Sequence, residues 1–451
     1  MNFNDNTIAA ISTPLGPGAI SIVRISGSMA LDILTKLFIQ KTPAALKSHT
    51  VYYGYIKYKG QILDEVLVTL MLSPNSYTKE DVVEISCHGG NVCAESVLRS
   101  VIDSGAMLAT PGEFTKRAFL NGRINLTQAE SVIDIINATS NTAKHMAISI
   151  LTGGLGSKVT NIRNNILSCI AALEVAIDYP EEGYFSNAQQ ILEEINNSLI
   201  SINDIINASA NYETIKQGVF VAVVGRPNVG KSSLLNALLN EDRAIVTNIP
   251  GTTRDTISAH LSIGHVPINL IDTAGIRQTT DKIEIIGQQR TNEAIQKADL
   301  VLAVFDISDN ISPIDIDIIK SAAQKKLLIV GNKLDLGQIA DTKWLTDYGK
   351  VIKISVEQNI GIEELKTAIT DYYPETDIKS EIVMANMRHV ECLQKTINFL
   401  SFAKQSIDLN QSEEFVSLDL TSAYTSLGEV LGEEITEDII DKIFSEFCLG
   451  K

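Results

Sequence analysis

The middle of the chain alternates short apolar runs with stretches of helical period. Residues 219–224 and 327–330 are continuous apolar runs, and residues 268–271 and 351–354 are apolar except for Asn269 and Lys353. All four ranges are strand-like, and the first indicates a buried strand. Residues 234–239 follow the first run and favour a helix. Buried strands that alternate with helices predict an α/β domain.

The N-terminal part of the chain has a different mixture of signals. Residues 8–11, 19–25 and 66–72 are strand-like, and residues 52–58 alternate before a hairpin glycine. Residues 94–104 favour a helix that stops at a glycine. We therefore expect a second, mixed α/β domain here.

Helical periodicity dominates the two remaining parts of the chain. Apolar residues recur at helical spacing over residues 143–178 and 188–216, with a break expected at Gly153. Thr127 and Glu130 match a capping box, which predicts the start of a helix. Further helices are expected over residues 384–407, 415–432 and 437–447.

Two helical segments that flank a complete α/β domain suggest one helical domain with the α/β domain inserted into it. The predicted protein is therefore multidomain. Its expected parts are an α/β domain over residues 1–120, an all-α helical domain over residues 121–217 and 375–451, and an inserted α/β domain over residues 218–374.

Residues 225–232 fit G-x-x-x-x-G-K-[ST], the phosphate-binding P-loop, between a predicted strand and a predicted helix. Its glycines let the backbone curl so that N–H groups face a phosphate. Lys231 can neutralise the β- and γ-phosphates and is a candidate catalytic residue, and the Ser232 hydroxyl can bind Mg²⁺. The residues expected to bind nucleotide in this loop are Asn228, Val229, Gly230, Lys231, Ser232 and Ser233.

Later motifs indicate that the base is guanine. Asn332, Lys333 and Asp335 form N-K-x-D, whose carboxylate accepts hydrogen bonds from the guanine N1–H and exocyclic amine. Adenine cannot offer that pair of donors. Ser355 fits the final base-contacting loop of such domains.

Two segments complete the set of GTPase motifs. Residues 272–275 form D-x-x-G, which places a carboxylate near Mg²⁺ and a glycine N–H near the γ-phosphate. Thr253, in the expected switch segment 251–255, would complete the Mg²⁺ coordination begun by Ser232. The inserted domain is therefore predicted to be a Ras-like P-loop GTPase. The nucleotide-binding residues expected in these two segments are Thr253, Asp272, Thr273, Ala274 and Gly275.

Composition and charge limit the cellular location and the kinds of ligand to be expected. No apolar run approaches the roughly 18 residues that span a bilayer, and the start lacks a signal-peptide pattern, so we expect a cytoplasmic protein. Five cysteines without a C-x-x-C pair argue against a zinc site. The net charge is −17, and residues 1–120 hold ten basic and ten acidic residues, so the whole excess lies beyond them. Binding to nucleic acid by general electrostatics is not expected.

Several blocks of the sequence resemble the MnmE (TrmE) family of tRNA-modification GTPases, over nearly the full length. The blocks are residues 7–10, 22–27, 80–84, 87–90, 111–123 and 447–451. The resemblance implies an N-terminal domain that binds 5-formyl- or 5,10-methylene-tetrahydrofolate and forms a homodimer. It also implies a helical domain and an inserted TrmE-type GTPase domain. With the FAD-dependent protein MnmG, as a heterotetramer, such proteins add an aminomethyl or carboxymethylaminomethyl group to C5 of the wobble uridine of certain tRNAs.

The same resemblance assigns roles at the folate pocket. Arg24, Glu84 and Arg123 would line it, and Lys451 would contribute from the C-terminus. Arginine suits the carboxylates of a folate and glutamate suits its pterin donors. The family often has Lys at the position of Arg123, which keeps the charge but changes the geometry. Cys448 matches the near-terminal cysteine and is a candidate catalytic residue.

The usual residue that orients the attacking water for GTP hydrolysis is missing from the sequence. Many GTPases orient water with a Gln just after D-x-x-G, and Ile276 occupies that position here. The resemblance implies that K⁺ and dimerisation of the GTPase domains fill this role, with Glu284 positioning the water. The residues expected to bind K⁺ are Asn228, Thr247, Ile249 and Thr252.

Two other interpretations stay open at this point. A ribosome-assembly GTPase with a similar K⁺-type switch would carry a basic RNA-binding domain, whereas the flanks here are neutral or acidic. A folate enzyme with a regulatory GTPase would transfer the one-carbon unit without MnmG.

Overall fold

The computed structural model describes residues 6–138, 140–179, 187–209, 216, 218–241, 257–264, 266–272, 291–373, 384–433 and 435–451. It divides into two compact units. The first comprises residues 1–133, 150–202 and 391–451, and the second comprises residues 134–149 and 203–390. Among the residues described, each unit contains one β-sheet.

The sheet of the first unit has seven strands in the order β3-β4-β5-β6-β2-β1-β7. Its neighbours are antiparallel except for the parallel pair β1 and β7. The strands are β1 (Ile8–Ile11), β2 (Ile20–Ser26), β3 (Phe38–Gln40), β4 (Thr50–Tyr58), β5 (Gln61–Met71), β6 (Val82–His88) and β7 (Met107–Leu108).

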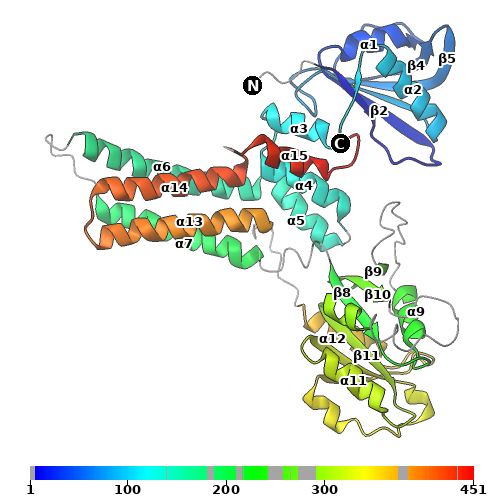
Figure 1. The fold of residues 1–451 in the computed structure, drawn as a ribbon. Coiled ribbons are helices and arrows are strands. Elements are labelled where there is room, and N and C mark those ends of the chain that lie inside the picture. Colours follow the sequence, from blue (N-terminus) through cyan, green and yellow to red (C-terminus); the bar gives the residue numbers. More distant parts are fainter. Residues whose placement is uncertain are drawn as a thin grey trace. The chain divides into compact units, whose positions relative to one another are not determined.

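Helices cover this sheet unequally. Helices α1 (Ala30–Leu37) and α2 (Asn91–Asp103) pack on one face, where Leu34 and Val97 are fully buried with Ile25 of β2 (Figure 1). On the other face, Phe114 of α3 (Glu113–Leu120) packs against Ile8 of β1. The open part of this second face is where polar side chains of β2 and β6 gather.

Long helices make up the rest of the first unit. Helix α14 lies along α6, where Ser417 Oγ donates to Glu174 at 2.8 Å (Figure 1). Helix α13 lies along α7, where Lys404 Nζ donates to Asn196 at 2.9 Å (Figure 1). Some of these helices run on into residues of the second unit. The helices are α4 (Leu126–Asn137), α5 (Asn141–Leu151), α6 (Gly154–Asp178), α7 (Ala188–Ser209), α13 (Met387–Asp408), α14 (Glu413–Leu431) and α15 (Glu437–Ser445).

The capping box predicted at Thr127 and Glu130 is wrong, because α4 has already begun at Leu126. The cap is instead Asn125, whose side chain accepts from the backbone N–H of Gln128 at 2.9 Å. Gln128 in turn accepts from the backbone N–H of Asn125 at 3.1 Å. The reciprocal pair satisfies two backbone donors of the first turn.

The sheet of the second unit has the order β13-β12-β11-β8-β10-β9, and only the pair β9 and β10 is antiparallel among its described neighbours. Its strands are β8 (Val219–Val224), β9 (Ile257–Ile263), β10 (Val266–Asp272), β11 (Leu300–Asp306), β12 (Lys326–Asn332) and β13 (Lys350–Lys353). The helices are α9 (Lys231–Glu241), α11 (Pro313–Ala322) and α12 (Ile362–Asp371), with 3₁₀ turns η2 (Leu334–Leu336) and η3 (Lys343–Asp347).

Both faces of this second sheet are covered. Leu234 of α9 and Leu365 of α12 share one apolar core with Val221 of β8. Ile319 of α11 shares the opposite core with Ala222 of β8. The predicted strands are thus confirmed, and β8 is buried as expected, whereas the edge strand β13 leaves Lys350 and Lys353 exposed. The carboxyl ends of the parallel strands form one edge where polar loops follow.

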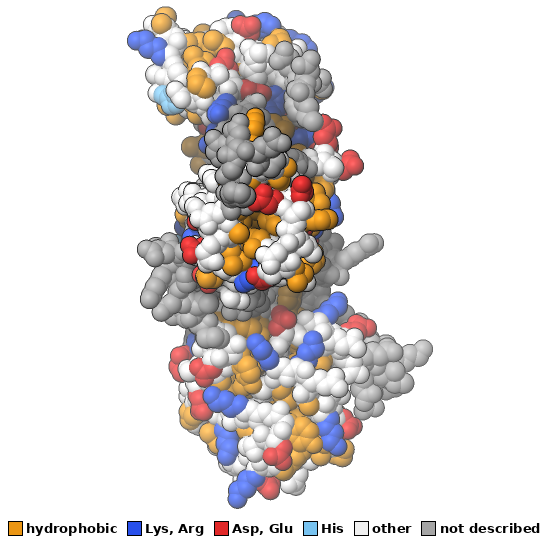
Figure 2. Space-filling view, turned by 90° about the vertical axis from the view of Figure 1, so that its left-hand side faces the viewer, with side chains coloured by type: hydrophobic (Ala, Val, Ile, Leu, Met, Phe, Trp, Pro, Cys, Tyr) orange, Lys and Arg blue, Asp and Glu red, His pale blue; other side chains and the backbone are white. Residues whose placement is uncertain are grey.

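The predicted multidomain class is confirmed by two sheets in separate chain segments with helical segments on both sides of the second. The exact domain boundaries stay a prediction. Within the described part of the chain, none of the helices combines the length and apolarity that crossing a bilayer requires. On the face drawn in Figure 2, basic and acidic side chains are intermixed.

Candidate functional site

The P-loop connects β8 to α9, and its lysine lies folded against the loop. Lys231 Nζ donates to the carbonyl oxygens of Gly225 at 2.8 Å and Arg226 at 2.7 Å. Ser232 and Ser233 are exposed in the first turn of α9. A phosphate oxygen is a charged acceptor and thus a stronger partner for the ammonium group than a carbonyl. The lysine is therefore placed to exchange its carbonyl partners for a phosphate.

Arg226 ties the start of the P-loop to α11. Its Nε lies 2.9 Å from both carboxylate oxygens of Asp315, whose side chain is only 2% exposed. Asp315 also accepts from the backbone N–H and the hydroxyl of Ser312, both at 3.0 Å, in a capping box at the start of α11. A buried carboxylate with this many donors is rigid, so it fixes the loop at its first residues.

Asn332, at the end of β12, links the P-loop to the two loops that should hold the base. Its Nδ2 donates to the carbonyl of Val229 at 2.9 Å, and its Oδ1 accepts from the N–H of Val356 at 3.3 Å. A Cβ on Gly230 would stand 2.2 Å from Asn332 Nδ2, and Gly230 has φ of 99°. Only glycine allows this close approach of the P-loop to Asn332.

The carboxylate of Asp335 is held by a buried serine. Ser355 Oγ donates to Asp335 Oδ1 at 2.5 Å and accepts from the N–H of Gln358 at 3.2 Å. The structure therefore brings together Asp335 and Ser355, as two motifs 20 positions apart in the chain predicted. A pre-oriented carboxylate can accept two donors from one edge of a base.

Lys333 is held apart from this carboxylate. Its Nζ lies 2.7 Å from Asp306 Oδ2 at the end of β11. Burial by itself would raise the pKa of Asp306, but the hydrogen bonds from Lys333 and Ser308 outweigh it and hold the pKa below the ordinary value. Asp306 therefore stays ionised and keeps the stem of Lys333 beside the base loops.

Several predicted residues of this region lie outside the described residues. Asp272 ends β10, and its side chain is not described. The others outside the described residues are Thr247, Ile249, Thr252, Thr253, Thr273, Ala274, Gly275, Ile276 and Glu284. Most of the groups expected around Mg²⁺ and K⁺ are thus not placed.

A second polar cluster lies on the sheet of the first unit. Arg24 of β2 and Glu84 of β6 are register partners, and Glu84 Oε1 accepts from Arg24 Nε at 2.9 Å and lies 2.8 Å from Nη2. Their side chains are 15% and 23% exposed. A paired guanidinium and carboxylate on one sheet face leave donors and acceptors side by side for a polar ligand.

The C-terminal tail reaches this pair. Arg24 Nη1 donates to the carbonyl of Gly450 at 3.3 Å, and the N–H of Gly112 donates to the carbonyl of Cys448 at 3.4 Å. Gly450 has φ of 87°, and a Cβ there would stand 2.3 Å from the carbonyl oxygen of Ile11. The tail can pass this close to β1 only because it has glycine at that position.

Among the other predicted residues of this cluster, Lys451 directly follows Gly450 and is half-buried, whereas the side chain of Cys448 is exposed. The buried thiol of Cys87 is a different case, because burial raises its pKa to about 11. Cys87 is therefore not a thiolate at neutral pH. Among the described residues, no group of three or more His, Cys, Asp or Glu side chains could hold a metal.

Two aromatic residues at this cluster were missed in the sequence. The guanidinium carbon of Arg24 lies 5.6 Å from the ring centre of Tyr77 and 5.5 Å from that of Phe114. The guanidinium carbon of Arg123 lies 4.5 Å from the ring centre of Tyr77. The available signal was Tyr77, the one aromatic residue in the otherwise polar run of residues 75–81.

The chain matches two family models and close curated relatives. Residues 7–123 match the GTP-binding protein TrmE N-terminus, and residues 126–448 match the MnmE helical domain. The tRNA modification GTPase MnmE of Acetivibrio thermocellus is 43% identical over 100% of both chains. The protein of that name from Thermoanaerobacter pseudethanolicus is 43% identical over 99% of both chains.

Solved structures add little. The G domain of the FeoB iron transporter of T. maritima is 28% identical over 35% of this chain and 99% of its own length, with a TM-score of 0.27 that supports no structural comparison. The full-length identity to the curated relatives, together with the two matching family models, shows that the chain belongs to the MnmE family of tRNA modification GTPases.

Proposed function

We propose that the chain hydrolyses GTP and, in complex with MnmG, adds a (carboxymethyl)aminomethyl group to C5 of the wobble uridine of certain tRNAs. The observation that carries the GTP part is the double role of Asn332. It joins the P-loop carbonyl of Val229 to the loop of Ser355, which holds Asp335. Phosphate and guanine subsites are thus held at a fixed separation.

Recognition of the nucleotide follows from these groups. Asp335 accepts the two donors on the guanine edge, and the Ser355 hydroxyl keeps that carboxylate in place. Lys231 releases its two carbonyl partners and neutralises the β- and γ-phosphates. The arrangement selects guanine because an adenine would leave the carboxylate of Asp335 without its two donors.

Two cations are proposed to support hydrolysis. The exposed hydroxyl of Ser232 fits a Mg²⁺ ligand beside Lys231, with Thr253 as its proposed companion. Asn228, which has φ of 65°, is proposed to offer a side-chain oxygen to K⁺ together with Thr247, Ile249 and Thr252. These ions offset the charge that develops on the transferring phosphoryl group, and Glu284 is proposed to orient the water.

GTP turnover is expected to be roughly 100-fold or more faster in K⁺ than in Na⁺, since one electrostatic contribution of this kind changes turnover by about 100- to 1,000-fold. The measurement is phosphate release at equal ionic strength. Asn228→Ala should lose the difference between the two salts while still binding GTP. Asn236→Ala, an exposed asparagine on α9, is the control and should behave like the wild type. Equal rates in both salts would contradict the K⁺ assignment.

The polar cluster on the first sheet is proposed to bind a reduced folate as one-carbon donor. The fit rests on Arg123, which has no carboxylate within ion-pair distance among the described residues, so its donors can serve a ligand carboxylate. Glu84 suits the donor edge of a pterin. The proposed pocket comprises Arg24, Glu84, Arg123 and Lys451, with Cys448 nearby on the same tail.

A homodimer is proposed through the open face of the same sheet. Tyr53 of β4 and Leu67 of β5 are register partners there, and with Val51 they are 43%, 47% and 58% exposed. Adjacent exposed apolar side chains on one sheet face are typical of an interface. Cytoplasmic location and assembly with MnmG and tRNA complete the proposal.

Cells that lack this chain are expected to lose the C5-modified wobble uridine, measured by nucleoside analysis of their tRNA. The intact chain and Arg99→Ala, an exposed arginine on α2, should restore the modified nucleoside. Lys231→Ala should not, because the phosphate charge stays uncompensated. Unchanged tRNA together with accumulated ribosome precursors would favour a ribosome-assembly GTPase instead.

A further inference from the structure

Three consecutive residues of the loop between β5 and β6 hold three consecutive residues that follow α3. The ring of Tyr77 lies against the guanidinium of Arg123 at 4.5 Å. The carbonyl of Thr78 accepts from Asn121 Nδ2 at 2.6 Å, and Lys79 Nζ donates to the carbonyl of Gly122 at 3.1 Å. We call residues 77–79 the clamp, because they hold residues 121–123 one by one.

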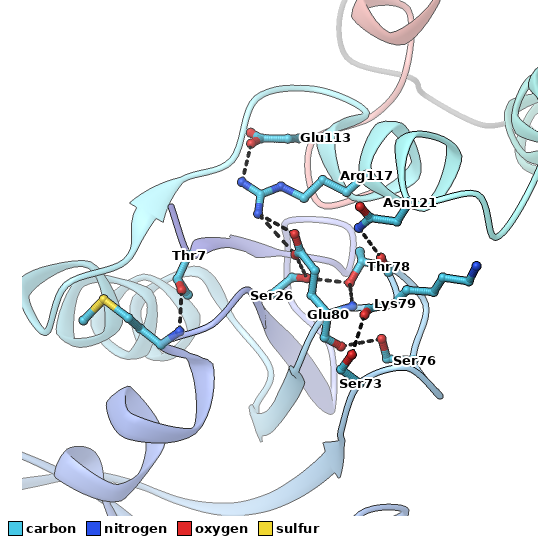
Figure 3. A network of polar contacts seen from close by, with 11 residues as sticks. Thr7, Ser26, Ser73, Ser76, Thr78, Lys79, Glu80, Glu113, Arg117 and Asn121 are labelled. Carbon is cyan, nitrogen blue, oxygen red and sulfur yellow. Dashed lines mark hydrogen bonds and ion pairs between the residues drawn. The ribbon is translucent and has the colours of Figure 1, made fainter. Parts of the chain in front are cut away.

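The clamp is held in place by hydrogen bonds that connect it to β2 and α3. Ser26 and Thr78 share a hydrogen bond of 2.6 Å, and both are fully buried (Figure 3). Glu80 accepts from Ser26 Oγ at 2.6 Å and from Arg117 Nη1 at 3.1 and 3.2 Å. Glu113 accepts from Arg117 Nη2 at 3.0 Å, so α3 and the loop are joined by one connected network (Figure 3). Connected polar networks of this kind are rigid.

Tyr77 is the point where this rigid loop meets both arginines of the proposed pocket. Its hydroxyl shares a hydrogen bond of 2.9 Å with the buried Thr115 of α3, which fixes the ring at its far end. The guanidinium carbons of Arg123 and Arg24 lie 4.5 and 5.6 Å from its ring centre. The face of an aromatic ring attracts a cation, so one ring holds two like charges close together.

The two arginines differ in what they can still bind. Arg24 already bonds Glu84 and the carbonyl of Gly450. Arg123 is an exposed residue, and among the described residues its guanidinium has the Tyr77 ring as its partner and no carboxylate within ion-pair distance. Its N–H donors are therefore available to an anionic group.

We propose that Tyr77 is a positioning residue: it places the guanidinium of Arg123 at a set distance from the Arg24–Glu84 pair, and Arg123 then receives the carboxylate end of the ligand. The inference rests on the proposed folate pocket and assigns its parts. The Arg24–Glu84 pair takes the pterin edge, and the clamp fixes where the anionic end must lie.

The test is a calorimetric titration of the full chain with 5-formyltetrahydrofolate. The variants to be compared carry Tyr, Phe, or a phenylalanine with one, two or three fluorine atoms on the ring at position 77. Fluorine weakens the negative ring face but hardly changes its size, so a merely structural role predicts equal affinities. We expect Tyr77→Phe to bind nearly as well as the wild type, each added fluorine to weaken binding further, and Tyr77→Leu to bind roughly 10-fold more weakly.

Two controls separate the possible failures. Tyr58→Leu removes a tyrosine that also lies against a cation, with Lys59 Nζ 4.8 Å from its ring centre, and should leave folate affinity unchanged. A tetrahydropterin without the glutamate tail should bind all variants alike. Equal folate affinities across the series, or a pterin affinity that follows the fluorines, would overturn the role of Tyr77. A wild-type chain that binds no folate would overturn the pocket and this inference with it.

Discussion

Replacing Asp335 with Asn is expected to switch the nucleotide preference of the protein from GTP to XTP. The carboxylate accepts two guanine donors, and hydrogen bonds to a charged group contribute about 1.5–3 kcal/mol each. Their loss should weaken GTP binding by roughly 100- to 10,000-fold. The amide that this substitution introduces can instead donate to the second carbonyl of xanthine, which stands where guanine carries its amine. Competition of GTP and XTP for a fluorescent nucleotide measures both affinities.

The structure supplies matched variants for this experiment. Asp341→Asn makes the same chemical change at an exposed carboxylate beyond η2, and it should leave the GTP affinity unchanged. Ser355→Ala removes the 2.5 Å bond that holds Asp335, so GTP binding should weaken without any gain for XTP. If Asp335→Asn kept its preference for GTP, the assignment of Asp335 to the guanine edge would be wrong.

Replacing Arg24 with Ala is expected to weaken folate binding strongly and to loosen the C-terminal tail. The substitution leaves Glu84 without its partner and removes the donor to the carbonyl of Gly450. A hydrogen bond between a charged group and its partner contributes about 1.5–3 kcal/mol, so losing the guanidinium donors should weaken folate binding by roughly 100-fold. Calorimetry measures the affinity, and hydrogen exchange of residues 447–451 measures the tail.

Arg99→Ala serves as the control, because this arginine of the same sheet unit is exposed on α2, on the covered side. It should change neither the folate affinity nor the exchange of the tail. Arg24→Lys keeps the charge but loses the forked geometry, and should lie between the two. If Arg24→Ala bound folate as tightly as the wild type, Arg24 would not be part of the pocket. If hydrogen exchange of residues 447–451 were unchanged, Arg24 would not hold the tail in place.

The motifs predicted for the nucleotide site are local in the sequence, whereas the residues of the sheet cluster come from distant segments. The P-loop residues from Asn228 to Ser233 are contiguous, and N-K-x-D and Ser355 follow strands, so local pattern locates them. The contact between Asn332 and Val229 needs only the parallel order of the strands to form. Mg²⁺ and K⁺ ligands stay predictions, since most lie outside the described residues.

The start of α4 offers two competing caps in the sequence. Residues 125–128 and 127–130 both offer a polar cap followed three residues later by Gln or Glu, and only the position of the first turn decides between them. The contacts of Tyr77 with Arg24 and Arg123 join a loop, a strand and a helix end. Local periodicity in the sequence cannot predict such long-range contacts. The sequence therefore showed Tyr77 but not the two arginines that it contacts.

The contact between Arg24 and Gly450 also sets an order of events during biosynthesis. The two residues are 426 positions apart in the chain. At roughly 5–20 residues per second, the ribosome needs about 20 to 85 s to travel from one to the other. The N-terminal sheet can fold long before its last polar partner has been made. A nascent chain that has not yet reached residue 450 therefore carries an incomplete cluster, in which Arg24 lacks one of its acceptors.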